Sequence, residues 1–168
     1  MKAMHPRKIR LTLLLISIFI VSAIQLNSQT SSNDDALAIT EYKTLPIIVQ
    51  DIRDNVAHLT KESVQNRVEL RIRSAGLKPL TGSGPLPPPR FLGVTVNIVG
   101  AAFDVDVKFY RSAFWNITAD KYGRGLVSTW ETGTTGTHGN SETFILGAVE
   151  KQMDQFLNAY LKANQDDK

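Results

Sequence analysis

Cysteine is absent from all 168 residues of the chain. This absence excludes a disulfide framework, a thiolate-bound metal ion and a lipid-modified N-terminal cysteine. Histidine is scarce as well, because the chain has only His5, His58 and His138, and no two of them lie at metal-ligand spacing. No H-E-x-x-H zinc motif occurs. We therefore predict a fold stabilised by an ordinary apolar core, with no metal and no cofactor.

Acidic residues are missing from the N-terminus, where MKAMHPRKIR is followed by the apolar run LTLLLISIFIVSAI. A basic segment, a short apolar run and small residues at Val21 and Ala23 are typical of a secretory signal peptide. The run is shorter than the roughly 20 residues that span a bilayer comfortably. We expect residues 1–23 to be cleaved after Ala23, with an uncleaved membrane anchor as the alternative. The expected location is therefore the periplasm or the exterior.

An excess of positive charge is missing from the rest of the chain. The full sequence has 19 basic and 16 acidic residues, and four of the basic residues belong to the first 23. The remaining 15 basic residues against 16 acidic ones give a net charge of −1. No overall basic field therefore remains to attract nucleic acid or an anionic membrane.

Phosphate-binding motifs are also absent, although GTTGTHGN, residues 133–140, is rich in glycine. A P-loop needs GxxxxGK followed by Ser or Thr, and a dinucleotide fold needs GxGxxG after a parallel strand. The segment matches neither pattern, so we interpret it as a strand-to-helix loop. A small-ligand site around His138 and Asn140 is the alternative.

The remaining sequence predicts one domain over residues 44–164. Residues 24–43 are polar and aperiodic and predict a flexible spacer, and residues 165–168 form a polar tail. A buried strand begins near Leu45, and a helix runs from its N-cap Thr60 to Gly76. LKPLTGSGPLPPPR then predicts an extended connection, because proline lacks the amide donor.

Two alternating runs, 92–98 and 103–109, predict an antiparallel hairpin around Gly100. The second strand is expected to continue through Trp115 and Ile117 past a bulge near Arg111. KYGRG, residues 121–125, predicts the next turn, and residues 125–131 predict the following strand. Apolar residues spaced by threes and fours then predict a long helix from Ser141 to about residue 163.

This order, β-α-β-β-β-α, predicts an α+β two-layer sandwich. We expect a mixed, mostly antiparallel sheet with two helices on one face. The opposite face should meet solvent or a partner, and its expected side chains are Thr95, Asn97, Asp104, Asp106 and Lys108.

Two groups of side chains are candidates for chemistry. Asp104 and Asp106 share a strand face at about 7 Å, a spacing compatible with acid–base work or ligand binding. Arg67 and Arg71 lie one helical turn apart and could hold an anion. The alternatives are a solvated strand face for the aspartates and ion pairs with Glu150 and Asp154 for the arginines. Trp115, Trp130, Phe156 and Tyr160 are interpreted as core aromatics.

Three segments carry a resemblance: RVELRIRSAG at residues 67–76, Ser128–Trp130 on a late strand, and FLNAYLKAN at residues 156–164. Together they resemble small exported bacterial proteins of uncharacterised families. That resemblance brings no catalytic residues. The element order is also similar to that of envelope accessory domains that bind partner proteins at outer-membrane assemblies.

The sequence thus predicts an exported, non-enzymatic domain that acts by protein interaction in the bacterial cell envelope. The open sheet face, an exposed sheet edge or the PLPPP stretch is the expected contact surface for an envelope protein partner. The alternative is a small enzyme or ligand-binding protein with its site where the Gly-rich segment meets the last helix.

Overall fold

A computed structural model describes residues 34–52, 58–81 and 88–165. The predicted signal peptide, residues 24–33 of the predicted spacer and residues 166–168 of the tail lie outside this part of the chain. The described elements are α2 (Asp34–Leu37), β1 (Thr44–Val49), α3 (Lys61–Ser74), β2 (Lys78–Leu80), β3 (Arg90–Val99), β4 (Ala102–Thr118), β5 (Lys121–Thr137) and α4 (Glu142–Gln165).

The strands form one five-stranded sheet in the order β2-β1-β3-β4-β5. β1 is parallel to β2 and β3, whereas β3, β4 and β5 pair antiparallel. The predicted α+β fold with the order β-α-β-β-β-α is confirmed, with α3 as the crossover between parallel strands. β2, three residues long, is an addition at the edge of the sheet, and Pro79 fits there because an edge strand does not need every amide.

Helix α3 begins and ends where its sequence predicts. The Thr60 hydroxyl accepts a hydrogen bond from the Ser63 amide at 3.0 Å, and the Ser63 hydroxyl accepts one from the Thr60 amide at 3.2 Å. This reciprocal cap satisfies two amides that the first helical turn leaves free. Gly76 then ends the helix with a φ of 77°, a left-handed conformation that glycine adopts without a steric penalty.

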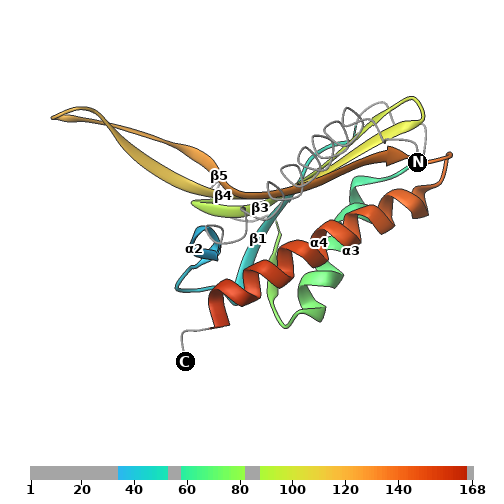
Figure 1. The fold of residues 1–168 in the computed structure, drawn as a ribbon, viewed down its shortest axis with the longest axis horizontal. Coiled ribbons are helices and arrows are strands. Elements are labelled where there is room, and N and C mark those ends of the chain that lie inside the picture. Colours follow the sequence, from blue (N-terminus) through green and yellow to red (C-terminus); the bar gives the residue numbers. More distant parts are fainter. Residues whose placement is uncertain (1–33, 53–57, 82–87, 166–168) are drawn as a thin grey trace, which may run out of the picture. The chain divides into compact units, whose positions relative to one another are not determined.

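The core lies between one face of the sheet and the two long helices. Helix α4 runs along the sheet with α3 beside it (Figure 1). The centre of this layer is aromatic, because the ring of Phe109 on β4 lies 6.0 Å from that of Phe156 and 5.9 Å from that of Tyr160. Trp130, Phe156 and Tyr160 thus belong to the core as predicted. Burial raises the pKa of the Tyr160 phenol, whose hydroxyl donates to the carbonyl of Tyr42 at 2.9 Å.

Residues 34–43, expected to belong to a polar spacer, are packed against the end of α4. Leu37 of α2 is fully buried. The amide group of Asn164 donates to the Leu37 carbonyl at 3.0 Å, and its side-chain oxygen accepts from the Ile39 amide at 2.8 Å. The segment is too short and irregular to show a hydrophobic period, so only the burial of Leu37 and these hydrogen bonds reveal that it belongs to the fold.

The β4–β5 hairpin is much longer than the sequence predicts. Each strand has 17 residues, and the turn consists of Ala119 and Asp120. The KYGRG segment is therefore strand, not turn, and residues 133–137 of the Gly-rich segment are strand, not loop. The expected bulge is present, with the register shift falling between Phe109 and Tyr110.

Helix α4 is too short to cover this hairpin. Its 24 residues span about 36 Å, whereas a strand of 17 residues spans about 55 Å. Because α4 starts directly after β5 and runs back along it, the far ends of β4 and β5 extend past both helices (Figure 1). None of the described helices is long and apolar enough to cross a bilayer.

We expect Asn164→Ala to lower the free energy of unfolding by about 1–3 kcal/mol, because it leaves the part-buried Ile39 amide and the buried Leu37 carbonyl without these partners. Urea denaturation and hydrogen exchange at the Ile39 amide would measure this effect. Asn158→Ala, an exposed position on the same helix, is the matched control. Equal stability of the two variants would contradict a stabilising role for the Asn164 hydrogen bonds.

Candidate functional site

His138, a candidate ligand residue, is buried, and its ring makes hydrogen bonds within the fold. Its side chain is 2% exposed, and Nε2 lies 2.9 Å from the carbonyl oxygen of Gly100. Nδ1 accepts a hydrogen bond from the amide of Asn140 at 2.9 Å. Asn140 itself is exposed and adopts a φ of 59°. Nε2 therefore joins the β5–α4 connection to the β3–β4 turn, and Nδ1 bonds within that connection, so neither ring nitrogen is left for a ligand.

Asp104 and Asp106 lie together on the open face of the sheet, as their spacing predicts. Desolvation raises the pKa of Asp104, and the nearby charge of Asp106 raises it further. Lys108 continues the row and forms a 3.7 Å ion pair with Glu131 of β5. The buried His138 lies at the strand-to-helix connection, so the structure does not bring it together with the two aspartates.

Arg67 and Arg71 of α3 are joined to α4. Glu150 accepts a hydrogen bond from Arg67 at 2.7 Å and another from Arg71 at 3.0 Å, and Asp154 lies 3.7 Å from Arg71. The two guanidinium groups are thus paired with carboxylates of the protein. The ion pairs considered as an alternative to an anion site are present, and they connect the two helices of the second layer.

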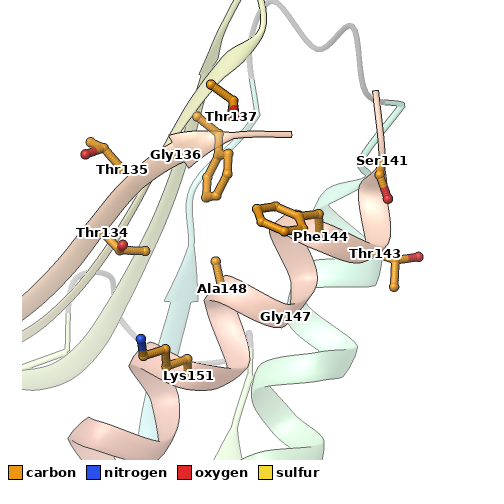
Figure 2. A pocket seen from close by; sticks show the side chains of 11 residues that line it. Thr134, Thr135, Gly136, Thr137, Ser141, Thr143, Phe144, Gly147, Ala148 and Lys151 are labelled. Atoms are coloured by element: carbon orange, nitrogen blue, oxygen red, sulfur yellow. The ribbon is translucent and has the colours of Figure 1, made fainter. Parts of the chain in front are cut away.

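Two other features have the shape of contact sites, and the first lies where the Gly-rich segment meets the last helix, the place of the alternative ligand site in the sequence analysis. The first is a groove between the end of β5 and the start of α4, with a volume of about 620 Å³ (Figure 2). Phe103 and Phe144 meet edge to face at one end of it, with ring centroids 6.1 Å apart. Lys151 is the one charged residue among those that line it, and His138 and Asn140 are not among them.

The second feature is the projecting end of the hairpin, residues 111–127, which we call the arm. β3 pairs with β4 as far as Arg111, and the amide of Ser112 donates to the carbonyl of Pro89 at 2.7 Å. Beyond Ser112 the described part of β4 pairs only with β5. Six large apolar side chains of the arm are exposed: Phe114 (68%), Tyr122 (67%), Ile117 (52%), Trp115 (49%), Val127 and Leu126. Trp115, interpreted from the sequence as a core residue, is therefore a surface residue.

Trp115 explains the two glycines of the arm. Its indole ring lies across Gly123 and Gly125 on the paired strand, so a Cβ atom at Gly123 would collide with the ring. On the other face, the Arg124 guanidinium lies 5.6 Å from the centroid of the Phe114 ring. These contacts stabilise the ribbon, but they leave both of its faces largely apolar.

The sequence contained partial signals for both features. The alternation of Phe114, Trp115 and Ile117 with small and polar residues favoured a strand, but the glycines of KYGRG favoured a turn. TGTTGT, residues 132–137, carries four β-branched threonines that favour a strand, yet its glycines suggested a loop. Gly123, Gly125 and Gly136 accommodate an aromatic ring from the neighbouring strand, and Gly133 accommodates the Asp106 carboxylate. These cross-strand neighbours cannot be inferred from local sequence.

The chain matches no protein-family model and none of the curated proteins with which it was compared. The resemblance to small exported bacterial proteins therefore stays a prediction. Within residues 34–52, 58–81 and 88–165, no cluster of three side chains of the metal-binding kind is present. The fold and the two surfaces define a structural class, an α+β sandwich with a protruding β-ribbon.

We expect Glu150→Gln to lower the free energy of unfolding at pH 7 by about 0.5–1 kcal/mol, since these ion pairs are partly exposed. Partial burial alone would raise the pKa of Glu150, but the hydrogen bonds from Arg71 and Arg67 outweigh it and lower the pKa below 4.5. The stabilisation is therefore present above pH 4.5 and is lost as the pH falls. Urea titrations from pH 3 to 7 would measure it, with Asp120→Asn as the control.

Asp104→Asn should change the free energy of unfolding in the opposite direction to Glu150→Gln. The folded-state pKa of Asp104 is raised above 3.8, so its ionisation opposes folding at neutral pH. The amide should therefore increase the free energy of unfolding at pH 7, and this gain should disappear once the pH falls below about 3.8, where the carboxyl is protonated in both states. The same urea titrations would measure it, and a loss of stability at pH 7 would contradict the assignment.

Proposed function

We propose that this protein is an exported, non-enzymatic domain that binds a protein partner in the bacterial cell envelope, and that the arm is its contact surface. The observation that carries the proposal is the arm itself: a two-stranded ribbon that projects from the sheet with six large apolar side chains exposed. The N-terminal pattern of residues 1–23 supports the export part of the proposal.

The energetics of the arm favour a partner. An isolated two-stranded ribbon is marginally stable in water, because neither of its faces is buried. Complete burial of one large apolar side chain contributes about 1.5–3 kcal/mol. Six such side chains on one projection therefore represent a large free energy that a complementary surface would release. Scattered apolar residues elsewhere on the surface carry no such implication.

The distribution of side chains along the arm favours a protein over a lipid bilayer. The turn at its end is polar, with Thr118, Asp120 and Lys121 around Ala119. Apolar residues instead run along its length, from Tyr122 near the turn to Val127 at the base. A bilayer would meet the polar turn first, whereas a protein groove can enclose both faces. Arg111, Lys121 and Arg124 against Asp120 give the arm a net charge of +2, which favours an acidic rim on the partner.

A small-ligand-binding protein is the second candidate function. The groove beside β5 supports it, because an apolar cavity of about 620 Å³ lined by Phe103 and Phe144 is the size of many ligand sites. Purification of the mature chain followed by mass spectrometry of bound small molecules would test it. A retained molecule displaced by Phe144→Ser would favour this candidate over the first.

The test of the arm uses the mature chain as bait in bacterial envelope extract. We expect the double substitution F114S/Y122S to lower partner capture at least thirtyfold, since a buried aromatic contact residue contributes about 2 kcal/mol or more. Leu70→Ser is the matched control, because Leu70 is exposed to 55% on α3, away from the arm.

A photo-crosslinker placed at Phe114 should join the same partner directly. Capture that is equally strong with F114S/Y122S, or a mature chain whose binding to anionic phospholipid vesicles depends on Phe114, would overturn the proposal. N-terminal sequencing of the mature protein tests export separately, and we expect it to begin at Ile24.

A further inference from the structure

Among the described residues, no strand covers the outer edge of β5 along the groove. β5 is the last strand of the sheet, and no other described strand pairs with its outer side. The amide of His138 donates to the carbonyl of Ala101 at 3.0 Å. In an antiparallel pair, alternate residues direct their backbone groups toward the neighbouring strand, so this bond shows which residues of β5 face β4. Residues 132, 134 and 136 therefore bond inward to β4. The N–H and C=O groups of Gly133, Thr135 and Thr137 point outward.

This edge lacks the usual protection against a further strand. Natural sheet edges are blocked by charges, prolines, bulges or short length. The opposite edge has such protection, because β2 is three residues long and contains Lys78 and Pro79. Residues 132–137, TGTTGT, contain no charge, no proline and no register shift. Threonine also favours the extended conformation.

The groove lies where the side chains of an added strand would point. Thr134 and Gly136 face α4, and a strand added about 4.8 Å outside β5 would place alternate side chains between β5 and the start of α4. Figure 2 shows this space, with Phe144 on one side and Thr134, Ala148 and Lys151 farther along. A Cβ atom at Gly136 would lie 2.9 Å from the ring of Phe103, so glycine lets that ring line the groove.

The lining defines the chemistry of the occupant. Phe103 and Phe144 near Gly136 suit an apolar side chain. Lys151, near Thr134, suits a carboxylate. Gly136 and Thr134 are two residues apart, the spacing at which neighbouring side chains of a strand point to the same face. Main-chain pairing supplies affinity in this mode of recognition and the pockets supply specificity.

We propose that β5 and α4 together bind an extended peptide of a partner protein, which adds as a strand to Gly133–Thr137 and places an apolar side chain against Phe144 and an acidic one, two residues away, at Lys151. This site is separate from the arm. It does not depend on the function proposed above.

The test uses a phage library of random decapeptides selected on the mature chain. We expect enrichment of sequences with an apolar and an acidic residue two positions apart. A synthetic peptide from the enriched set should bind Gly147→Trp at least tenfold more weakly, because a side chain at Gly147 has open space and would fill the groove. Gly147→Ala, which leaves the groove open, is the matched control.

A second pair of variants separates backbone pairing from charge. Thr135→Pro removes one outward amide without breaking the bonds to β4 and should weaken binding about tenfold. Lys151→Glu should abolish the preference for acid. Each variant is first checked by circular dichroism and thermal unfolding, and the two act on different elements, so one misfolded variant leaves the other informative.

Failure to enrich any sequence would overturn the proposal, as would undiminished binding by Gly147→Trp or Thr135→Pro. Persistence of the acidic preference in Lys151→Glu would overturn the assignment of Lys151. The arm variant F114S/Y122S should bind the peptide normally, so failure here and failure of the arm proposal are distinguishable.

Discussion

The aromatic contact of Phe109 with Phe156 and Tyr160 is the interaction on which the rest of the structure depends. It holds α4 against β4, and through α4 it holds α3, because Glu150 pairs with Arg67 and Arg71. The hydroxyl of Tyr160 and the amide of Asn164 then fix residues 37–42 to the same helix. One helix therefore organises the second layer of the molecule.

The limited length of that helix creates both candidate contact surfaces. A helix rises about 1.5 Å per residue and a strand about 3.4 Å, so α4 cannot follow a hairpin of 17-residue strands to its end. The uncovered end becomes the arm. At the other end, where α4 leaves β5, the small residues Gly136, Gly147 and Ala148 leave space between the two elements unfilled, and this space is the groove.

Much of the fold could be predicted because its signals are local. The Thr60 cap, the left-handed Gly76 and the four-residue spacing of Val64, Val68 and Ile72 each report a state that the neighbouring residues alone determine. The candidate site was less predictable. The sequence suggested His138 as a ligand-binding residue, but it could not show that the ring bonds to Gly100, which lies 38 positions away in the sequence. Arg67 and Arg71, by contrast, pair with Glu150 and Asp154, the acids that the sequence analysis named as their alternative partners.

The sequence by itself determined the number, type and order of the major elements and the face that each buries, since hydrophobic period and capping act over a few residues. Only the tertiary structure decided that Trp115 is outside the core, that KYGRG continues a strand and that TGTTGT forms an edge that no described strand covers. The physical reason is that glycine has no side chain from which its environment could be inferred. Whether it makes a turn or accommodates a ring depends on the strand beside it.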